Sequence, residues 1–240
     1  MPSFPGVAAE PDGVVPDGSG IVLRDVVFRA DDGRGRAIVD GVSLAVAPWE
    51  PVVLNGPNGS GKSTALRLAA GVLTPAEGAA AVSGLPADLA AARGLLGSVP
   101  QRQQFPPGTV ADTIARFHLT SAEPVVAAAR AAGLQEIVGR LPRGYATRTG
   151  ANDPQFSDGQ RQRLALSRAL FGDPPALVLD EPDAGLDHEG EQVPVSALVA
   201  ARARAAILVV THRRPLLCVA DRVVRLAGGR LVSEEQREAA

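Results

Sequence analysis

Apolar and polar positions follow two patterns along the chain, and together these patterns predict most of its elements. Short apolar runs that stop at polar residues are typical of strands buried on both faces of a parallel sheet. Such runs occur at Pro51–Leu54, Ala176–Leu179 and Ala206–Val210. Further strands are predicted at Ile21–Leu23, Val26–Phe28 and Val42–Val46, with a closing hairpin over 223–232.

Stretches with helical character lie between these strands. They are predicted at Ser63–Val72, Pro124–Gly133 and Gln160–Phe171. Because strands alternate with helices, we predict an α/β fold with a largely parallel sheet covered on both faces. One domain is expected over residues 21–232, with a disordered arm at 1–20 and a tail at 233–240.

The composition indicates an ordered globular chain. Of 240 residues, 45% are hydrophobic and 21% are charged, which excludes wholesale disorder. The net charge of −2 argues against a dedicated nucleic-acid-binding protein, because such proteins usually carry a strong basic excess. The chain has one cysteine, Cys218, and lacks both a signal peptide and an apolar run of 18 residues. We therefore expect a cytoplasmic protein.

The segment that follows the first central strand carries the most specific chemical signal. It reads Gly56-Pro57-Asn58-Gly59-Ser60-Gly61-Lys62-Ser63-Thr64 and fits G-x-x-x-x-G-K-[ST]. In such a loop, glycines let backbone N–H groups surround a phosphate, and the following helix adds positive potential. Lys62 is the single lysine among 24 Lys and Arg residues. It would reach the β- and γ-phosphates of ATP, and Ser63 would bind Mg²⁺. The alternative is a glycine-rich turn that caps a helix.

Two carboxylates end the second central run. Asp180 and Glu181 directly follow Leu179. At the carboxyl end of a parallel strand they would lie beside the phosphate loop, where ligands bind. Asp180 would hold Mg²⁺ through water, and Glu181 would polarise the attacking water. The alternative is an acidic cap of the next helix.

The residues just before that run resemble a family signature. Phe156–Leu170 reads FSDGQRQRLALSRAL, which is similar to the L-S-G-G-Q-R-Q-R motif and Ala-rich helix of ABC-type ATPases. An amphipathic helix with a serine cap is the alternative. The family order continues with a glutamine loop at Pro100-Gln101, a D-loop at Ala184–Asp187 and a switch histidine at Thr211-His212. The resemblance spans about residues 21–232.

This resemblance implies a fold and a set of ligands. The fold is a P-loop NTPase of ABC type, whose mostly parallel core sheet carries an antiparallel β subdomain and a helical subdomain at about 102–170. The ligands are ATP and Mg²⁺. The resemblance places Gln101 at the metal with Ser63 and Asp180, and also among the catalytic residues with Lys62, Glu181 and His212.

The resemblance also implies partners. Members of the family form head-to-tail dimers in which Ser157, Gly159 and Gln160 of one copy face the phosphate loop of the other. A second ABC ATPase domain and a transmembrane permease are therefore expected, on the cytoplasmic face of the membrane, and nucleic acid is not. Phe105–Ile114 and Leu141–Gly150 resemble segments of exporters, and the second is the loop that contacts the membrane domain.

Several positions depart from the family pattern. Ala30 stands where an aromatic residue usually stacks on adenine, and Phe28 could replace it only if the strand register slips. Trp49 and Asp158 replace glycines, the latter within the signature, and Ala151 replaces an acidic residue common in exporters. The leading interpretation is an ATP-hydrolysing domain or subunit of an exporter. The alternatives are a low-turnover ATP-binding partner in a heterodimer, or a soluble ABC ATPase that does not transport.

Overall fold

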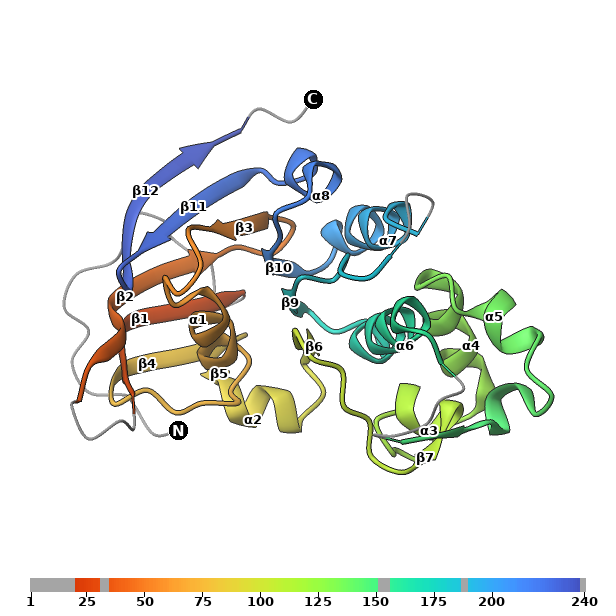
Figure 1. Ribbon diagram of the computed structural model, residues 1–240. Coiled ribbons are helices and arrows are strands. Elements are labelled where there is room, and N and C mark those ends of the chain that lie inside the picture. The colour runs from red at the N-terminus through yellow and green to blue at the C-terminus, as the bar shows by residue number, and fades with distance from the viewer. Residues whose placement is uncertain (1–19, 31–34, 151–155, 187–189, 238–240) are drawn as a thin grey trace.

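Two lobes make up the computed structural model, which describes residues 20–30, 35–150, 156–186 and 190–237 (Figure 1). One lobe holds the two larger sheets and helix α1 (Lys62–Ala69), and the other gathers helices α3 to α6. Apart from Gly20, the arm predicted at 1–20 lies outside the described residues. None of the described helices is long and apolar enough to cross a membrane.

The central sheet has six strands in the order β12-β11-β3-β10-β9-β6. Their bounds are β3 Pro51–Asn55, β6 Leu96–Val99, β9 Ala176–Asp180, β10 Ala206–Val210, β11 Arg222–Ala227 and β12 Arg230–Gln236. All neighbouring pairs are parallel except β11 and β12, which form the predicted closing hairpin. The three predicted central strands are therefore confirmed. Strand β12 continues to Gln236, so the tail predicted from residue 233 begins too early.

A second sheet is antiparallel and has the order β2-β1-β4-β5. Its strands are β1 Ile21–Arg29, β2 Ala37–Val46, β4 Glu77–Val82 and β5 Leu85–Pro86. The two strands predicted at 21–23 and 26–28 are one strand, because Asp25 at φ 46° only interrupts its pairing. A bulge of this kind bends a strand without ending it.

The central strands serve two separate hydrophobic cores. In β9, Leu177 and Leu179 join the core shared with the helical lobe, whereas Ala176 and Val178 join the core under α1 and the antiparallel sheet. Successive side chains of a strand point to opposite faces, so an all-apolar run fills both cores. This dual burial explains why the central strands read as continuous apolar runs.

The helical lobe is built around α6 (Asp158–Leu170), which packs against β6, α3 and α4. The other elements beyond the sheets are α2 Ala87–Ala92, α3 Val110–Ile114, α4 Ala122–Ala131, α5 Gln135–Gly139, α7 Gln192–Arg202, α8 Arg214–Cys218, a 3-10 turn at Gly144–Ala146, and the paired strands β7 Gly108–Thr109 and β8 Arg148–Thr149. Helices α3 to α6 lie within the range predicted as helical, and the signature segment begins α6.

Candidate active site

The phosphate loop runs from the end of β3 to the start of α1, as predicted. Gly56, Gly59 and Gly61 adopt φ values of 148°, 77° and 103°, which side chains rarely allow. A Cβ atom on Gly56 would lie 2.0 Å from the Leu226 carbonyl oxygen, and one on Gly61 would lie 2.6 Å from a backbone oxygen of β2. The glycines are thus required by neighbouring backbone as well as by the shape of the loop.

The Lys62 ammonium lies inside this loop. Its Nζ donates to the carbonyl oxygens of Gly56 at 2.8 Å and Pro57 at 3.0 Å, and the residue is 8% exposed. The loop therefore holds a buried positive charge at its centre. The Ser60 hydroxyl is also buried, and it has no hydrogen-bond partner within the part of the chain that the structure describes, as expected for a group that faces an anionic ligand.

A cavity of about 530 Å³ opens in front of the loop. Its lining comes from the phosphate loop and four other segments: residues 58–64, Arg36 and Ile38, Gln101, Glu181, and Val210 with His212. The volume lies in the usual range for ligand pockets. The structure thus brings the predicted loop, Gln101, Glu181 and His212 into one site. Gly56 and Pro57 support the loop without lining the cavity.

Asp180 and Ser63 form an oxygen donor pair: Ser63 lines this cavity, whereas Asp180 lines a smaller pocket that shares Gln101 with it. Asp180 ends β9 and is 5% exposed, and its Oδ1 has no hydrogen-bond partner among the described groups. Burial raises the pKa of the Asp180 carboxyl, and its hydrogen bond with Ser63 works in the opposite direction. An unpartnered carboxylate oxygen next to a hydroxyl fits a hard divalent cation such as Mg²⁺.

Glu181 occupies a strained backbone conformation beside His212. Its φ of 50° is in the left-handed region, and its N–H donates to the Val210 carbonyl oxygen at 2.9 Å. Strain of this kind costs about 1–3 kcal/mol and clusters at active sites. His212 Nε2 lies 4.0 Å from Glu181 Oε1. The two side chains that the sequence assigned to the reaction are therefore neighbours.

Hydrogen bonds connect Thr211, which precedes the predicted switch histidine, to the segment after Glu181. Thr211 Oγ1 donates to Asp183 Oδ2 at 2.7 Å and accepts from the Arg213 N–H at 3.0 Å. Burial raises the pKa of the Asp183 carboxyl, and the hydrogen bond from Thr211 partly offsets this rise. These bonds fix the backbone on both sides of His212. In the predicted D-loop, Asp187 lies outside the described residues.

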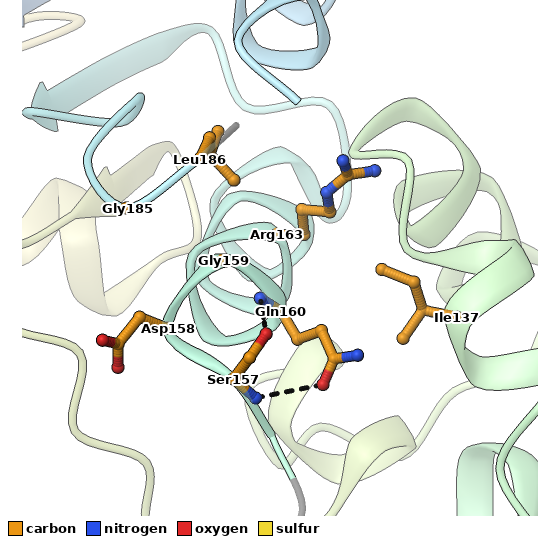
Figure 2. Close-up of a pocket in the computed structure, with 8 residues that line it drawn as sticks. All are labelled: Ile137, Ser157, Asp158, Gly159, Gln160, Arg163, Gly185 and Leu186. Atoms are coloured by element: carbon orange, nitrogen blue, oxygen red, sulfur yellow. Dashed lines mark hydrogen bonds between the residues drawn. The ribbon is translucent and has the colours of Figure 1, made fainter. Parts of the chain in front are cut away.

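The signature segment begins α6 with a capping box (Figure 2). Ser157 Oγ accepts from the Gln160 N–H at 3.3 Å, and Gln160 Oε1 accepts from the Ser157 N–H at 3.1 Å. The exposed Asp158 carboxylate points away from Gln160. A Cβ atom on Gly159 would lie 3.2 Å from the Gly185 carbonyl oxygen, so the helix start packs closely on the D-loop backbone.

The structure does not bring the signature residues to the phosphate loop of the same chain. Ser157, Gly159 and Gln160 line a separate pocket of about 320 Å³, together with Arg163 and Leu186 among others. This pocket and the cavity in front of the phosphate loop have no lining residue in common. Within one chain, the predicted site residues therefore form two half-sites.

Sequence reasoning missed Arg36, which lines the cavity on the side of the antiparallel sheet. The Ala30 N–H donates to the Arg36 carbonyl oxygen at 2.8 Å, so Arg36 lies directly across the hairpin from the position of the missing aromatic ring. Phe28 pairs with Val39 and packs against the buried core, so it does not take that position. The signal for Arg36 is a pairing between strands, which no local motif displays.

Comparison with known proteins identifies relatives for most of the chain. The profile of the family described as ABC transporter matches residues 39–184. The chain is 39% identical over 201 residues to the type I secretion system ATP-binding protein PrsD of Rhizobium meliloti, which covers 82% of this chain and 34% of that protein. It is 37% identical over 217 residues to the ATP-dependent lipid A-core flippase of Paraburkholderia xenovorans, covering 88% and 36%.

A solved structure shares the fold as well. The structure of a bacterial Atm1-family ABC exporter with ATP bound superposes with a TM-score of 0.81 at 33% identity, covering 96% of this chain and 41% of that one. The chain spans about a third of the length of the curated relatives described above. The match therefore concerns one domain of those longer proteins.

Proposed function

The chain belongs to the ABC transporter family, and we propose that it is the ATP-hydrolysing domain or subunit of an exporter. The observation that carries this proposal is the cavity that gathers the phosphate loop, Gln101, Glu181 and His212 at one edge of the sheet. The reaction is ATP + H₂O → ADP + phosphate. Its free energy would open and close a dimer of ATPase domains and so drive transport through a transmembrane partner.

Each residue of the site has a separate role in this reaction. Lys62 and the backbone N–H groups of the loop hold the β- and γ-phosphates. Ser63 and Asp180, with Gln101, would hold Mg²⁺, and the ion would supply positive charge beside the phosphates. Glu181 accepts the proton of the attacking water at its carboxylate, and His212 orients that water toward the γ-phosphate.

Two half-sites on one chain support a composite site between two chains. In a head-to-tail dimer, Ser157, Gly159 and Gln160 of one copy would face the γ-phosphate held by the loop of the other. The capping box leaves the first N–H groups of α6 directed at that phosphate, with the positive end of the helix dipole. We place this dimer at the cytoplasmic face of the membrane, bound to a permease through the segment 141–150.

Two variants test the assignment. Lys62→Ala is expected to abolish hydrolysis and to weaken ATP binding strongly, because it removes the buried charge from the loop. Glu181→Gln is expected to bind ATP like the parent chain and to lose turnover, which traps the ATP-bound dimer. Steady-state phosphate release and ATP titration measure both effects. Parental turnover in Glu181→Gln would show that another group polarises the water.

A low-turnover partner of a heterodimer is the second candidate function. Two observations favour it: Ala30 supplies no stacking ring, and Asp158 places a carboxylate at the start of α6. In that case the purified chain binds ATP but hydrolyses it no faster than Glu181→Gln. The same phosphate-release assay therefore separates the two functions.

A further inference from the structure

A buried glutamine links three segments of the candidate site. Gln162 lies in α6 and is 4% exposed. Its Nε2 donates to the main-chain carbonyl oxygen of Glu181 at 3.0 Å, and its Oε1 accepts from Gln103 Nε2 at 2.5 Å. Gln103 follows the predicted glutamine loop by two residues. One side chain thus joins the signature helix, the glutamine-loop segment and the end of β9.

The chemistry of this position suits an amide and no other side chain of the same size. A glutamine offers a donor and an acceptor at one end, and here each is used toward a different segment. A methionine of similar length offers no N–H donor, and a carboxylate accepts from Gln103 but cannot donate to the Glu181 carbonyl. The two bonds therefore depend on the residue type.

The carbonyl that Gln162 contacts belongs to the strained backbone that carries the Glu181 side chain. Glu181 is held at φ 50°, and its carbonyl oxygen also accepts from the Ala184 N–H at 3.0 Å. A strained conformation persists only where the surroundings fix it. Because the Cα atom joins this carbonyl to the side chain, a rotation of the peptide would move the carboxylate away from His212 and the cavity.

We propose that Gln162 is a positioning residue for hydrolysis. Its two hydrogen bonds make the direction of the Glu181 carboxylate depend on where α6 and the glutamine-loop segment lie. This inference rests on the proposed function. Gln162 lies roughly 7 Å along α6 from Ser157, where the partner's nucleotide would bind. Closure of the dimer on the helix start therefore reaches the water-polarising group through one rigid helix and one hydrogen bond.

A purely structural role makes a different prediction. A buried glutamine that only satisfies polar groups would, when replaced, lower stability and loosen the whole site. A positioning residue lowers kcat while ATP binding stays the same, because the phosphate loop and the metal donors are untouched. The separation of kcat from KM therefore distinguishes the two roles.

Four variants of the full chain provide the test. Gln162→Met removes both bonds, Gln162→Glu removes the bond to Glu181 and keeps an acceptor for Gln103, and Gln103→Met removes only the outer bond. Ser167→Ala is the matched control, because Ser167 is also buried in α6 but its hydroxyl donates within its own helix, to the Arg163 carbonyl oxygen. Steady-state ATPase kinetics, ATP affinity and the urea unfolding midpoint are measured for each.

Both Gln162 variants are expected to lower kcat about tenfold with KM and ATP affinity within about twofold of the parent. Gln103→Met should lower kcat less, and adding it to Gln162→Met should cause no further loss, since both act through one bond network. Parental kcat in folded Gln162 variants overturns the inference. The inference is also overturned if the Gln162 variants change kcat, KM and the urea unfolding midpoint together and Ser167→Ala shows the same changes.

Gln103→Met keeps the inference testable if the Gln162 variants fail to fold, since Gln103 is only half-buried. Unchanged kcat in that variant then overturns it. A parent chain that hydrolyses no ATP contradicts the proposed function itself, which is a separate outcome from a parent that is active and insensitive to these substitutions.

Discussion

Single residues of the candidate site show where backbone strain coincides with the proposed chemistry. Glu181 is a non-glycine residue with φ of 50°; it follows Asp180, which we propose as a metal donor, and it lines the cavity together with His212. A non-glycine residue at positive φ is uncommon and indicates a local constraint. Here hydrogen bonds hold the Glu181 backbone in this conformation. Its partners are Val210 at the end of β10, Gln162 in α6 and Ala184 in the turn that follows Glu181.

The base-binding side of the cavity can be tested at Ala30. Without a stacking ring, phosphate and Mg²⁺ contacts carry most of the affinity, so ATP and GTP should bind within about tenfold of each other. Ala30→Tyr should tighten ATP binding by about 1 kcal/mol, because it restores a ring next to the cavity. Nucleotide titration by calorimetry measures both. A strong native preference for ATP that Ala30→Tyr leaves unchanged would show that another group recognises the base, and Arg36 is then the first residue to replace.

Asp158 can be tested through dimer formation. At about 5 Å and an effective dielectric of about 20, its carboxylate would repel a γ-phosphate by up to ~3 kcal/mol. The side chain is exposed and points away from Gln160, so solvent screens much of that repulsion. We expect Asp158→Asn in a Glu181→Gln background to raise ATP-driven dimerisation about threefold. Light scattering with and without ATP gives the dimer fraction, and equal fractions in the two proteins would remove the repulsion from the account.

At the scale of elements, Arg222 joins strands that are far apart in the sequence. Its buried guanidinium contacts Glu50 at 2.9 Å, before β3, and Glu234 at 2.7 Å, in β12, and it donates to the Ala45 carbonyl oxygen in β2. The antiparallel sheet and the central sheet therefore meet around one charge. Removal of this charge would leave the carboxylate of Glu50, which is 20% exposed, without its ion-pair partner, and the Ala45 carbonyl oxygen without this donor, whereas Glu234 is exposed to solvent.

Arg222→Met is expected to lower the free energy of unfolding by about 3 kcal/mol. Removal of one partner of a buried ion pair costs more stability than the intact pair contributes, because the remaining charge stays buried without its partner. Arg230→Met is the matched control. Arg230 also forms an ion pair, with Asp40 at 2.7 Å, but its side chain is 69% exposed. The control should cost less than about 1 kcal/mol. Urea denaturation followed by circular dichroism gives both values. Similar losses would show that burial does not set the strength of the Arg222 network.

The sequence predicts those elements whose pattern is local. The central strands β3, β9 and β10 are short runs made almost entirely of apolar residues, and α1 and α6 begin at motifs with a fixed order, so all five are found from the sequence. Strand β6 is not, because its four residues include Gly97 and the exposed Ser98 and form no apolar run. It becomes a strand only by pairing with β9.

The residues of the candidate site also differ in whether a local sequence pattern predicts them. The phosphate loop, Asp180 and Glu181 lie in contiguous motifs, and the family order adds Gln101 and His212. Arg36 and Gln162 are found only in three dimensions, because a strand pairing brings one to the cavity and a hydrogen bond between segments gives the other its place. Nothing in their local sequence specifies either contact.

At the scale of the whole molecule, the two lobes present two incomplete halves of one site. The phosphate loop belongs to the lobe that holds the two larger sheets, and the signature segment begins the central helix of the other lobe (Figure 1). The pockets around them have no lining residue in common. Under the proposed function, a second copy or a related domain supplies the missing half of the site and encloses ATP. Activity should therefore belong to the dimer rather than to the single chain.

The dependence of the ATPase rate on protein concentration shows whether hydrolysis requires the dimer. Phosphate release per chain is measured with saturating Mg²⁺ and ATP over a wide range of concentrations of the purified parent chain, with Lys62→Ala as the inactive control. We predict that the rate per chain rises with concentration and levels off once the dimer is fully formed. A measurable rate per chain that stays constant down to the lowest concentration, or no hydrolysis at any concentration, would contradict the account.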